Sequence, residues 1–358
     1  MISGIANLPL HYGSCPPWLF EKMKKLAGAI TEIIIYEYSD DEFLKRLSDP
    51  FWFQAFACVL GFDWHSSGVT TTVCGAMKEA LNKENIGVVV AGGKGKTSRK
   101  TPEEIEKFGE ALSLSDSKIK NLVYSSKMSA KVDNAALQDG YNLYHHCFIF
   151  NEKGRWVVIQ QGMNLENRYA RRYHWISDKI NETKSFVEEP ESAICCDKKE
   201  EKILNMVAKE SKSVRENSVA VVNDIKNFEK FFRDKKFLKE LSLPSQHNVT
   251  VNKTIVSYLK KAYEVNPENY EELLALRGIG PASVRALALI SSLIYGSEPS
   301  WKDPVKFSFA HGGKDGHPYP VDRENYEKSI EILTTALENA KIGEKEKLQA
   351  MRRLSYFI

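Results

Sequence analysis

Long apolar runs are missing from this sequence of 358 residues. Even the longest of them, FWFQAFACVLGF, stops well short of the roughly 18 to 20 residues that a membrane-spanning helix needs. The segment MISGIANLPLHYG lacks the basic cap and apolar stretch of a signal peptide. Cysteine is scarce too: six residues are too few for a disulfide scaffold, and none forms a paired Cys-x-x-Cys zinc pattern. We therefore expect a reduced, cytoplasmic protein with no membrane partner.

An excess of one charge is also absent, because 50 basic and 47 acidic residues leave a net charge of only +3. This balance excludes a polybasic tail. It does not exclude a nucleic-acid surface, which depends on where the charges cluster. The chain is 42% hydrophobic and 11% aromatic, which excludes a disordered or collagen-like protein. At about 150 residues per domain, the length predicts two or three domains.

The order of elements predicts an α/β domain with a mixed sheet over residues 1–185, a linker over 186–199, and an all-α domain over 200–358. Strands are expected at 32–38, 85–93, 141–150 and 155–163, from their β-branched and aromatic content, and Thr101-Pro102 is expected to begin a helix. The segment KSFVEEPESAICCDKK is polar and unpatterned, which indicates the linker. The stretches 200–218, 223–241, 248–264 and 346–357 are helical in pattern.

The strands 141–150 and 155–163 read as a hairpin around Asn151-Glu152-Lys153-Gly154. A loop of two or of four residues pairs Phe150 with Arg155, so that His145 faces Gln160 and His146 faces Ile159. Strand alternation places His145 and His146 on opposite faces of the sheet, so one of them can serve a given site.

Residues 272–293 have the form of a helix-hairpin-helix within the all-α domain. Gly278 and Gly280 would let backbone N–H groups approach a phosphate, Ile279 would fill the hairpin core, and the second helix, from Pro281, would offer its N-terminal dipole. Arg285 could add a charged contact. Such a module binds the DNA backbone without reading sequence. An ordinary helix pair joined by a glycine turn is the alternative.

Polar clusters in the first half indicate metal chemistry. Asp63 and His65 lie two apart, Asp139 precedes the strand that carries two histidines, Gln160-Gln161 follow on the paired strand, and a further histidine is His11. Aspartate with histidine suits a divalent metal that activates water for phosphodiester hydrolysis. We expect Mg or Mn bound by Asp63, His65 and Asp139, with catalytic roles shared among these three and His145, His146 and Gln160. The alternative is that each histidine is a hydrogen-bonded structural residue.

Two basic stretches favour phosphate contacts. The glycine-rich loop after the second strand carries Lys94, Lys96, Arg99 and Lys100, and it departs from a Walker A loop because Val90 replaces the first glycine. The stretch NRYARRYHW would place Arg168, Arg171 and Arg172 on one helical face among aromatic residues, which suits nucleotide stacking and phosphate binding. A solvated helix face is the alternative for the second stretch.

Several blocks along the chain are similar to the signatures of the domain-of-unknown-function family 763, in order from about residue 3 to about residue 330: GIANLPLHYG, WFQAFACVLGFDWHSSGVTT, VAGGKGKTSRKTPEEI, NAALQDGYNLYHHCFIF, RWVVIQQGMN, ARRYHW, GIGPASVRALAL and FAHGGKDGHPYPVDR. The resemblance implies an archaeal or thermophilic-bacterial DNA-processing protein with a nuclease-like N-terminal domain joined to a helix-hairpin-helix.

The expected function is therefore DNA binding without sequence preference, with metal-dependent deoxyribonuclease activity in DNA processing or repair. Two alternatives stay open. One is a base-excision glycosylase using Asp322, although Ala282 stands where many such enzymes carry a catalytic lysine. The other is a non-catalytic DNA-binding scaffold. DNA, duplex or single-stranded, is the expected partner, and a homodimer is a candidate assembly.

Overall fold

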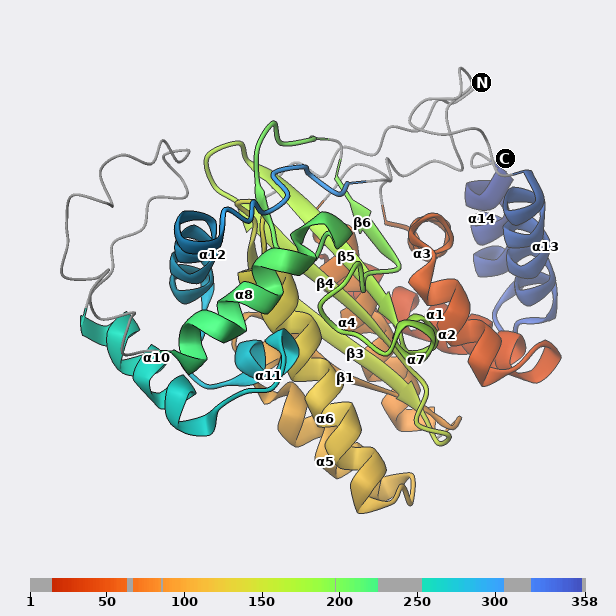
Figure 1. Ribbon diagram of the computed structural model, residues 1–358. Coiled ribbons are helices and arrows are strands. Elements are labelled where there is room, and N and C mark those ends of the chain that lie inside the picture. The colour runs from red at the N-terminus through yellow and green to blue at the C-terminus, as the bar shows by residue number, and fades with distance from the viewer. Residues whose placement is uncertain are drawn as a thin grey trace.

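An antiparallel sheet of five strands forms the centre of the protein, in the order β1-β3-β4-β5-β6 (Figure 1). The computed structural model describes residues 15–62, 67–84, 86–196, 198–224, 253–305 and 323–355. The strands are β1 (Val88–Lys94), β3 (Asn142–Asn151), β4 (Trp156–Asn164), β5 (Tyr169–Ile176) and β6 (Ala193–Cys195). The predicted α/β class is confirmed, but the sheet is antiparallel throughout its described strands rather than mixed.

Helices cover both faces of this sheet (Figure 1). The core on one face is shared by α1 (Pro17–Glu37), α2 (Asp40–Ser48), α3 (Pro50–Leu60) and α4 (Gly68–Glu84), and by the outer helices α13 (Arg323–Asn339) and α14 (Glu344–Ser355), which pack on α1 and α3. The core on the other face is shared by α5 (Thr101–Ala111) and α6 (Asp116–Lys131), which pack on the strands, and by α8 (Lys212–Asn223), α10 (Lys253–Val265), α11 (Tyr270–Ala275) and α12 (Pro281–Tyr295), which pack beyond them. The short elements are the 3₁₀ turns η1 (Gly95–Lys100) and η3 (Lys209–Ser211), the π turn η2 (Val132–Ala136), α7 (Ser177–Thr183), and the strand pair β2 (Leu137–Gln138) and β7 (Leu204–Asn205).

Strand alternation divides the apolar residues between two cores. On β3, Cys147 and Ile149 join the core under α1–α4, whereas Phe148 and Phe150 join the core under α5 and α6. Because both faces are covered, the central strands read as nearly continuous apolar runs. None of the helices within the described residues is long and apolar enough to cross a bilayer.

The strand expected at residues 32–38 is wrong, because that segment is the last part of α1. Its β-branched residues favour a strand locally. However, Ile30 and Ile34 continue the buried stripe that Met23 and Leu26 begin, at helical spacing. Burial of this stripe outweighs local propensity, since most helix stability in proteins comes from packing of the apolar face.

The β3–β4 hairpin is confirmed, but its predicted register is wrong by one residue. Phe150 pairs with Trp156 and His146 pairs with Gln160. The loop has three residues between Asn151 and Arg155, and Gly154 takes the left-handed conformation with φ +84°. The Asn151 side chain fixes this loop by accepting hydrogen bonds from the backbone N–H groups of Lys153 (3.1 Å) and Arg155 (2.9 Å).

The segment 186–199 does not form the solvated linker that its composition predicts. Phe186 and Val187 are buried in the core under α6, and β6 pairs with β5 at the edge of the sheet. Residues 200–211, expected to be helical, instead form the short strand β7 and a 3₁₀ turn before α8. One continuous core therefore joins residues before and after this segment.

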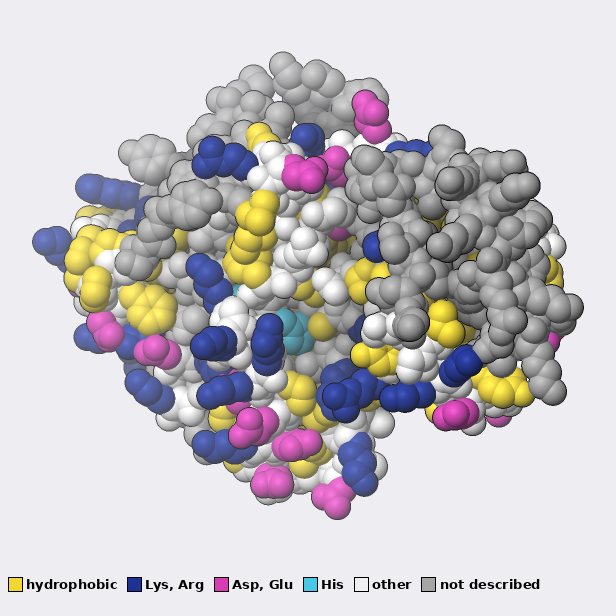
Figure 2. Space-filling view, turned by 90° about the vertical axis from the view of Figure 1, so that its left-hand side faces the viewer, with side chains coloured by type: hydrophobic (Ala, Val, Ile, Leu, Met, Phe, Trp, Pro, Cys, Tyr) yellow, Lys and Arg dark blue, Asp and Glu magenta, His cyan; other side chains and the backbone are white. Residues whose placement is uncertain are grey.

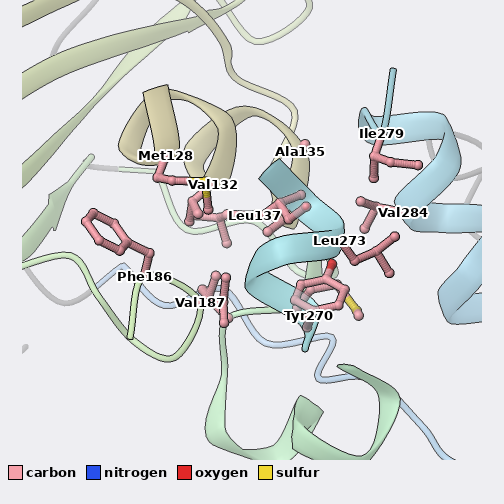
Figure 3. Packing of buried hydrophobic residues seen from close by; sticks show 14 of the residues in the cluster. Met128, Val132, Ala135, Leu137, Phe186, Val187, Tyr270, Leu273, Ile279 and Val284 are labelled. Atoms are coloured by element: carbon pink, nitrogen blue, oxygen red, sulfur yellow. The ribbon is translucent and has the colours of Figure 1, made fainter. Parts of the chain in front are cut away.

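Helices α11 and α12 flank the predicted glycine turn. Ile279 is buried, and Figure 3 shows it beside Val284 and Leu273 in the core that also holds residues of α6 and η2. Gly278 has φ +93°, and a Cβ there would lie 2.1 Å from the ring of Tyr258 on α10. Gly280 has no heavy atom within 4 Å of its would-be Cβ. The first glycine is therefore required by the fold, whereas the second leaves open space above the turn.

Candidate functional site

A pocket of about 530 Å³ opens between α6, the start of β3 and the η1 turn. Its described lining includes Arg99, Lys127 and Lys131 and contains no aspartate or glutamate. His145 and His146 also line it, and Figure 2 shows a histidine in a hollow edged by lysine and arginine side chains. The charge of the lining favours an anionic ligand.

A chain of hydrogen bonds runs from this pocket into the core. Ser126 Oγ lies 2.9 Å from His146 Nε2, and His146 Nδ1 lies 2.8 Å from Gln160 Oε1. The Gln160 amide nitrogen donates to the Ser129 carbonyl (3.0 Å) and to the Asp133 carboxyl group. Asp133 also accepts from Trp175 Nε1 at 2.8 Å.

The direction of these hydrogen bonds follows from Gln160. The Ser129 carbonyl can only accept, so it holds the NH₂ group of the amide and turns the amide oxygen toward His146. His146 must then carry its proton on Nδ1, which leaves Nε2 as the acceptor for the Ser126 hydroxyl. Burial lowers the pKa of His146 to about 4, so the ring is neutral at pH 7 and keeps this arrangement. Hydroxyl, imidazole and amide thus lie in the order of a hydrolytic triad.

The glycine turn lies beside the same pocket. Ala275, at the end of α11, lines the pocket, and Lys131 Nζ donates to the Leu276 carbonyl at 2.5 Å. Partial burial lowers the pKa of Lys131 to about 8. Arg285, predicted to point at DNA, is half-buried and donates instead to Gln138 Oε1 at 2.7 Å. Its guanidinium therefore ties α12 to β2.

Asp139, predicted as a metal ligand, is held in an ion-pair network. Its carboxylate accepts from Arg171 Nη1 (2.9 Å), from the Tyr173 hydroxyl (2.7 Å) and from the Tyr141 backbone N–H (3.1 Å). Arg171 also binds Asp303 through both Nη atoms, at 3.1 and 2.8 Å. Nothing in this geometry turns Asp139 toward the histidines, so its predicted metal role has no support.

The stretch NRYARRYHW is not a helix but includes the loop before β5 and most of β5. Arg171 and Arg172 therefore point to opposite faces of the sheet, and both are fully buried. Arg172 lies over the Phe53 ring and donates to Gln54 Oε1 at 3.2 Å. Arg168 remains exposed in the loop, with φ +60°. The predicted helical face is therefore wrong, because these residues follow the alternation of a buried strand.

The other basic stretch lies on the surface, as a phosphate-binding loop requires. Lys94 ends β1, and Lys96, Arg99 and Lys100 lie on the η1 turn, all four exposed. Arg99 contributes to the pocket wall. The remaining predicted residues, His11, Asp63, His65 and Asp322, lie outside the described residues.

A second cluster was not predicted from the sequence. Cys74 of α4 and His145 and Cys147 of β3 bring one ligand atom each within 4.8 Å of one another, and all three side chains are buried. These soft ligands do not match the expected Mg or Mn. A His-x-Cys spacing on a strand was visible in the sequence, but nothing linked it to Cys74. Ser126 was missed as well, because a mid-helix serine carries no motif.

Comparison with known families places the chain in one of them. The model of a family described as a protein of unknown function (DUF763) matches residues 4–321. No curated protein and no solved structure shows significant similarity. The match spans most of the 358 residues, and the chain therefore belongs to the DUF763 family.

Proposed function

We propose that this protein binds the sugar-phosphate backbone of DNA and hydrolyses a phosphodiester bond in the pocket between α6 and β3. The observation that carries the proposal is the Ser126–His146–Gln160 chain at the floor of a pocket whose described charges are all basic. Phosphate is the anion that DNA presents, and lysine and arginine neutralise it.

The DNA would run along the basic residues that line the pocket and the η1 turn. A helix-hairpin-helix at α11–α12 would bind one phosphate through the backbone around Gly280, where open space faces the turn. The strand would then pass Ala275 into the pocket, where Lys127 and Lys131 contact the phosphate to be cleaved. The exposed lysines of the η1 turn would bind phosphates beyond it. These contacts reach the backbone alone, so binding would be independent of sequence.

In the reaction, Ser126 Oγ attacks phosphorus as its proton passes to His146 Nε2, and the leaving sugar oxygen takes that proton as its bond to phosphorus breaks. Water then attacks the phosphoserine ester with His146 as the base, the Oγ–P bond breaks, and the proton passes from His146 to Ser126 Oγ. Gln160 holds the imidazole in the required tautomer, and the lysines stabilise charge on the phosphoryl oxygens. We expect cleavage to survive EDTA, because the described lining of the pocket offers no carboxylate for Mg or Mn.

The test compares two adjacent serines of α6. Ser125 is buried like Ser126 but donates to the Asn121 carbonyl at 2.8 Å, so it supplies a matched control. Plasmid and labelled oligonucleotides, duplex and single-stranded, are incubated with wild type, S126A, S125A and H146Q, with magnesium, with manganese and with EDTA. We expect S126A and H146Q to lose cleavage at least about a hundredfold and to keep DNA affinity. Equal cleavage by S126A and S125A would rule out this mechanism.

Binding without turnover is the second candidate, because Ser126 is only 2% exposed and His146 only 6%. It predicts the same salt-sensitive affinity for DNA and no cleavage by any variant under any metal. The cleavage assay separates the two candidates directly.

A further inference from the structure

The cluster of Cys74, His145 and Cys147 is positioned by a stripe of residues along α4. Thr70, Cys74, Lys78 and Asn82 recur every four residues and so share one helix face. Asn82 exchanges two hydrogen bonds with the backbone of Val90, at 2.9 and 2.8 Å, and Lys78 donates to the Gly92 carbonyl at 2.8 Å. These contacts hold this face of α4 against β1 and place Cys74 over the neighbouring β3.

The two ligands from β3 are two residues apart and therefore project to the same side of the sheet. Each of the three side chains is at most 2% exposed. Their ligand atoms lie within 4.8 Å of one another. Tetrahedral zinc with bonds of about 2.3 Å to sulfur needs the two sulfurs about 3.8 Å apart, so small side-chain rotations would complete the site.

The His145 side chain is independent evidence that this cluster binds a ligand. Neither of its ring nitrogens has a hydrogen-bond partner in the described part of the chain. Its cross-strand neighbour Gln161 is occupied, because its amide donates to the Ser67 carbonyl at 2.8 Å and to the Tyr144 hydroxyl. A buried imidazole with both nitrogens unpaired costs stability, and a metal ion would satisfy one of them.

We propose that Cys74, Cys147 and His145 form a zinc site with one coordination position open. Two thiolates and an imidazole are the ligands that zinc prefers over magnesium or manganese. Two thiolates would also neutralise the charge of the ion in a buried position. The open position follows from a second pocket of about 490 Å³, which Cys74 and Cys147 line and from which water can reach the metal. Three protein ligands and one water are typical of catalytic zinc.

Burial favours the protonated form of the Cys74 thiol, so metal binding must displace this proton. Burial raises the pKa of the thiol well above its ordinary value, and the nearby Arg172 guanidinium offsets only part of that rise. Burial also lowers the pKa of His145 to about 3, which keeps the ring unprotonated. Binding of zinc would displace the thiol protons, so zinc binding would be accompanied by release of protons. The site adjoins the pocket of the proposed hydrolysis, because His145 lines that pocket whereas Cys74 and Cys147 line the second one.

The test measures metal in the full-length protein. Wild type, C74S, C147S and H145Q are produced with added zinc, purified under reducing conditions, and assayed for zinc by mass spectrometry. C196S is the matched control, because Cys196 is another buried, free cysteine that lies outside the cluster. We expect about one zinc per chain in wild type and C196S, and at least about a tenfold loss in the three ligand variants.

A spectroscopic measurement keeps the proposal testable if a ligand variant fails to fold. Cobalt added to metal-free wild type should produce sulfur-to-cobalt charge-transfer bands and the visible bands of tetrahedral cobalt, and added zinc should bleach both. Excess magnesium should change neither. A folded wild-type protein that lacks zinc and shows no thiolate bands with cobalt would overturn the proposal. So would equal zinc content in folded C74S and C196S.

Discussion

The Asp139 carboxylate and the Arg171 guanidinium meet at 2.9 Å, and neither side chain reaches solvent. Arg171 also binds Asp303, so a single cation joins the turn between β2 and β3 to the segment that follows α12. We read this network as structural.

Replacing Asp139 with asparagine should therefore destabilise the protein without changing its metal content. Removing one member of a buried pair leaves an uncompensated charge and costs about 3 to 5 kcal/mol. Urea denaturation measures the loss. D178N is the control, because Asp178 pairs with Arg155 in a part-exposed position where the cost is about 1 kcal/mol or less. Loss of bound zinc in folded D139N would contradict this role.

The two glycines of the α11–α12 turn should respond differently to substitution. G278A should unfold the turn region, because its Cβ would meet the Tyr258 ring at 2.1 Å and φ is +93°. G280D should remain as stable as wild type, since the position has open space and aspartate is a favourable N-cap for α12.

The same G280D variant should bind DNA at least about tenfold more weakly, because its carboxylate repels a phosphate at this turn. G280N keeps the shape without the charge and serves as the control. Fluorescence anisotropy with a short duplex measures both. If G280D bound the duplex with wild-type affinity, the DNA would not contact this turn.

Lys131 should make DNA binding sensitive to pH. Its pKa of about 8 lies below the ordinary value for lysine, so the side chain is charged below pH 8 and neutral above it. Affinity should therefore fall as the pH rises from 7 to 9. K131Q should bind more weakly at pH 7, with a salt dependence reduced by about one counterion, and should lose the pH effect. K127Q should weaken binding yet keep the pH effect, because Lys131 remains. An unchanged pH profile in K131Q would exclude Lys131 as its source.

Asn151 should be essential to the register of the β3–β4 hairpin. Besides binding two backbone N–H groups of the loop, its amide donates to Asp40 and Asp41, both at 2.8 Å. N151A should cost about 1 to 3 kcal/mol, because the fully buried Asn151 side chain and its part-buried partners lose four hydrogen bonds. N151D should cost more, since a third carboxylate would face the two already there. Urea denaturation of both variants gives the order, and a smaller loss in N151D would contradict it.

Local sequence pattern was sufficient to predict the elements whose own residues favour one type of secondary structure. The hairpin strands, the buried strand β1 and the glycine turn follow from β-branched runs, glycine and proline. The hairpin register did not, because it depends on a side chain of Asn151 that selects a three-residue loop. The segment ending α1 was misread for a related reason: its burial partners lie far along the chain.

The candidate site was predictable only in part. His146 and Gln160 were selected from the sequence, and the structure pairs them directly. Ser126 and Cys74 could not be selected, because each acquires its chemistry from a strand that is distant in sequence. Asp139 and Arg171 were selected as separate functional residues for their charges. In the structure they form a buried ion pair with each other, which gives both charges a structural role. Which distant residues contact one another cannot be predicted from a single sequence.

The last described helices complete the core begun by the first ones. Residues of α13 and α14 share the apolar cluster of α1–α4, and Arg353 binds the Val59 carbonyl through Nε (3.0 Å) and Nη2 (2.7 Å). During translation, this N-terminal layer therefore emerges from the ribosome long before its covering helices exist. The part of its apolar surface that α13 and α14 cover cannot be buried by them until residue 354 has been synthesised, so the nascent chain exposes that surface through most of its synthesis.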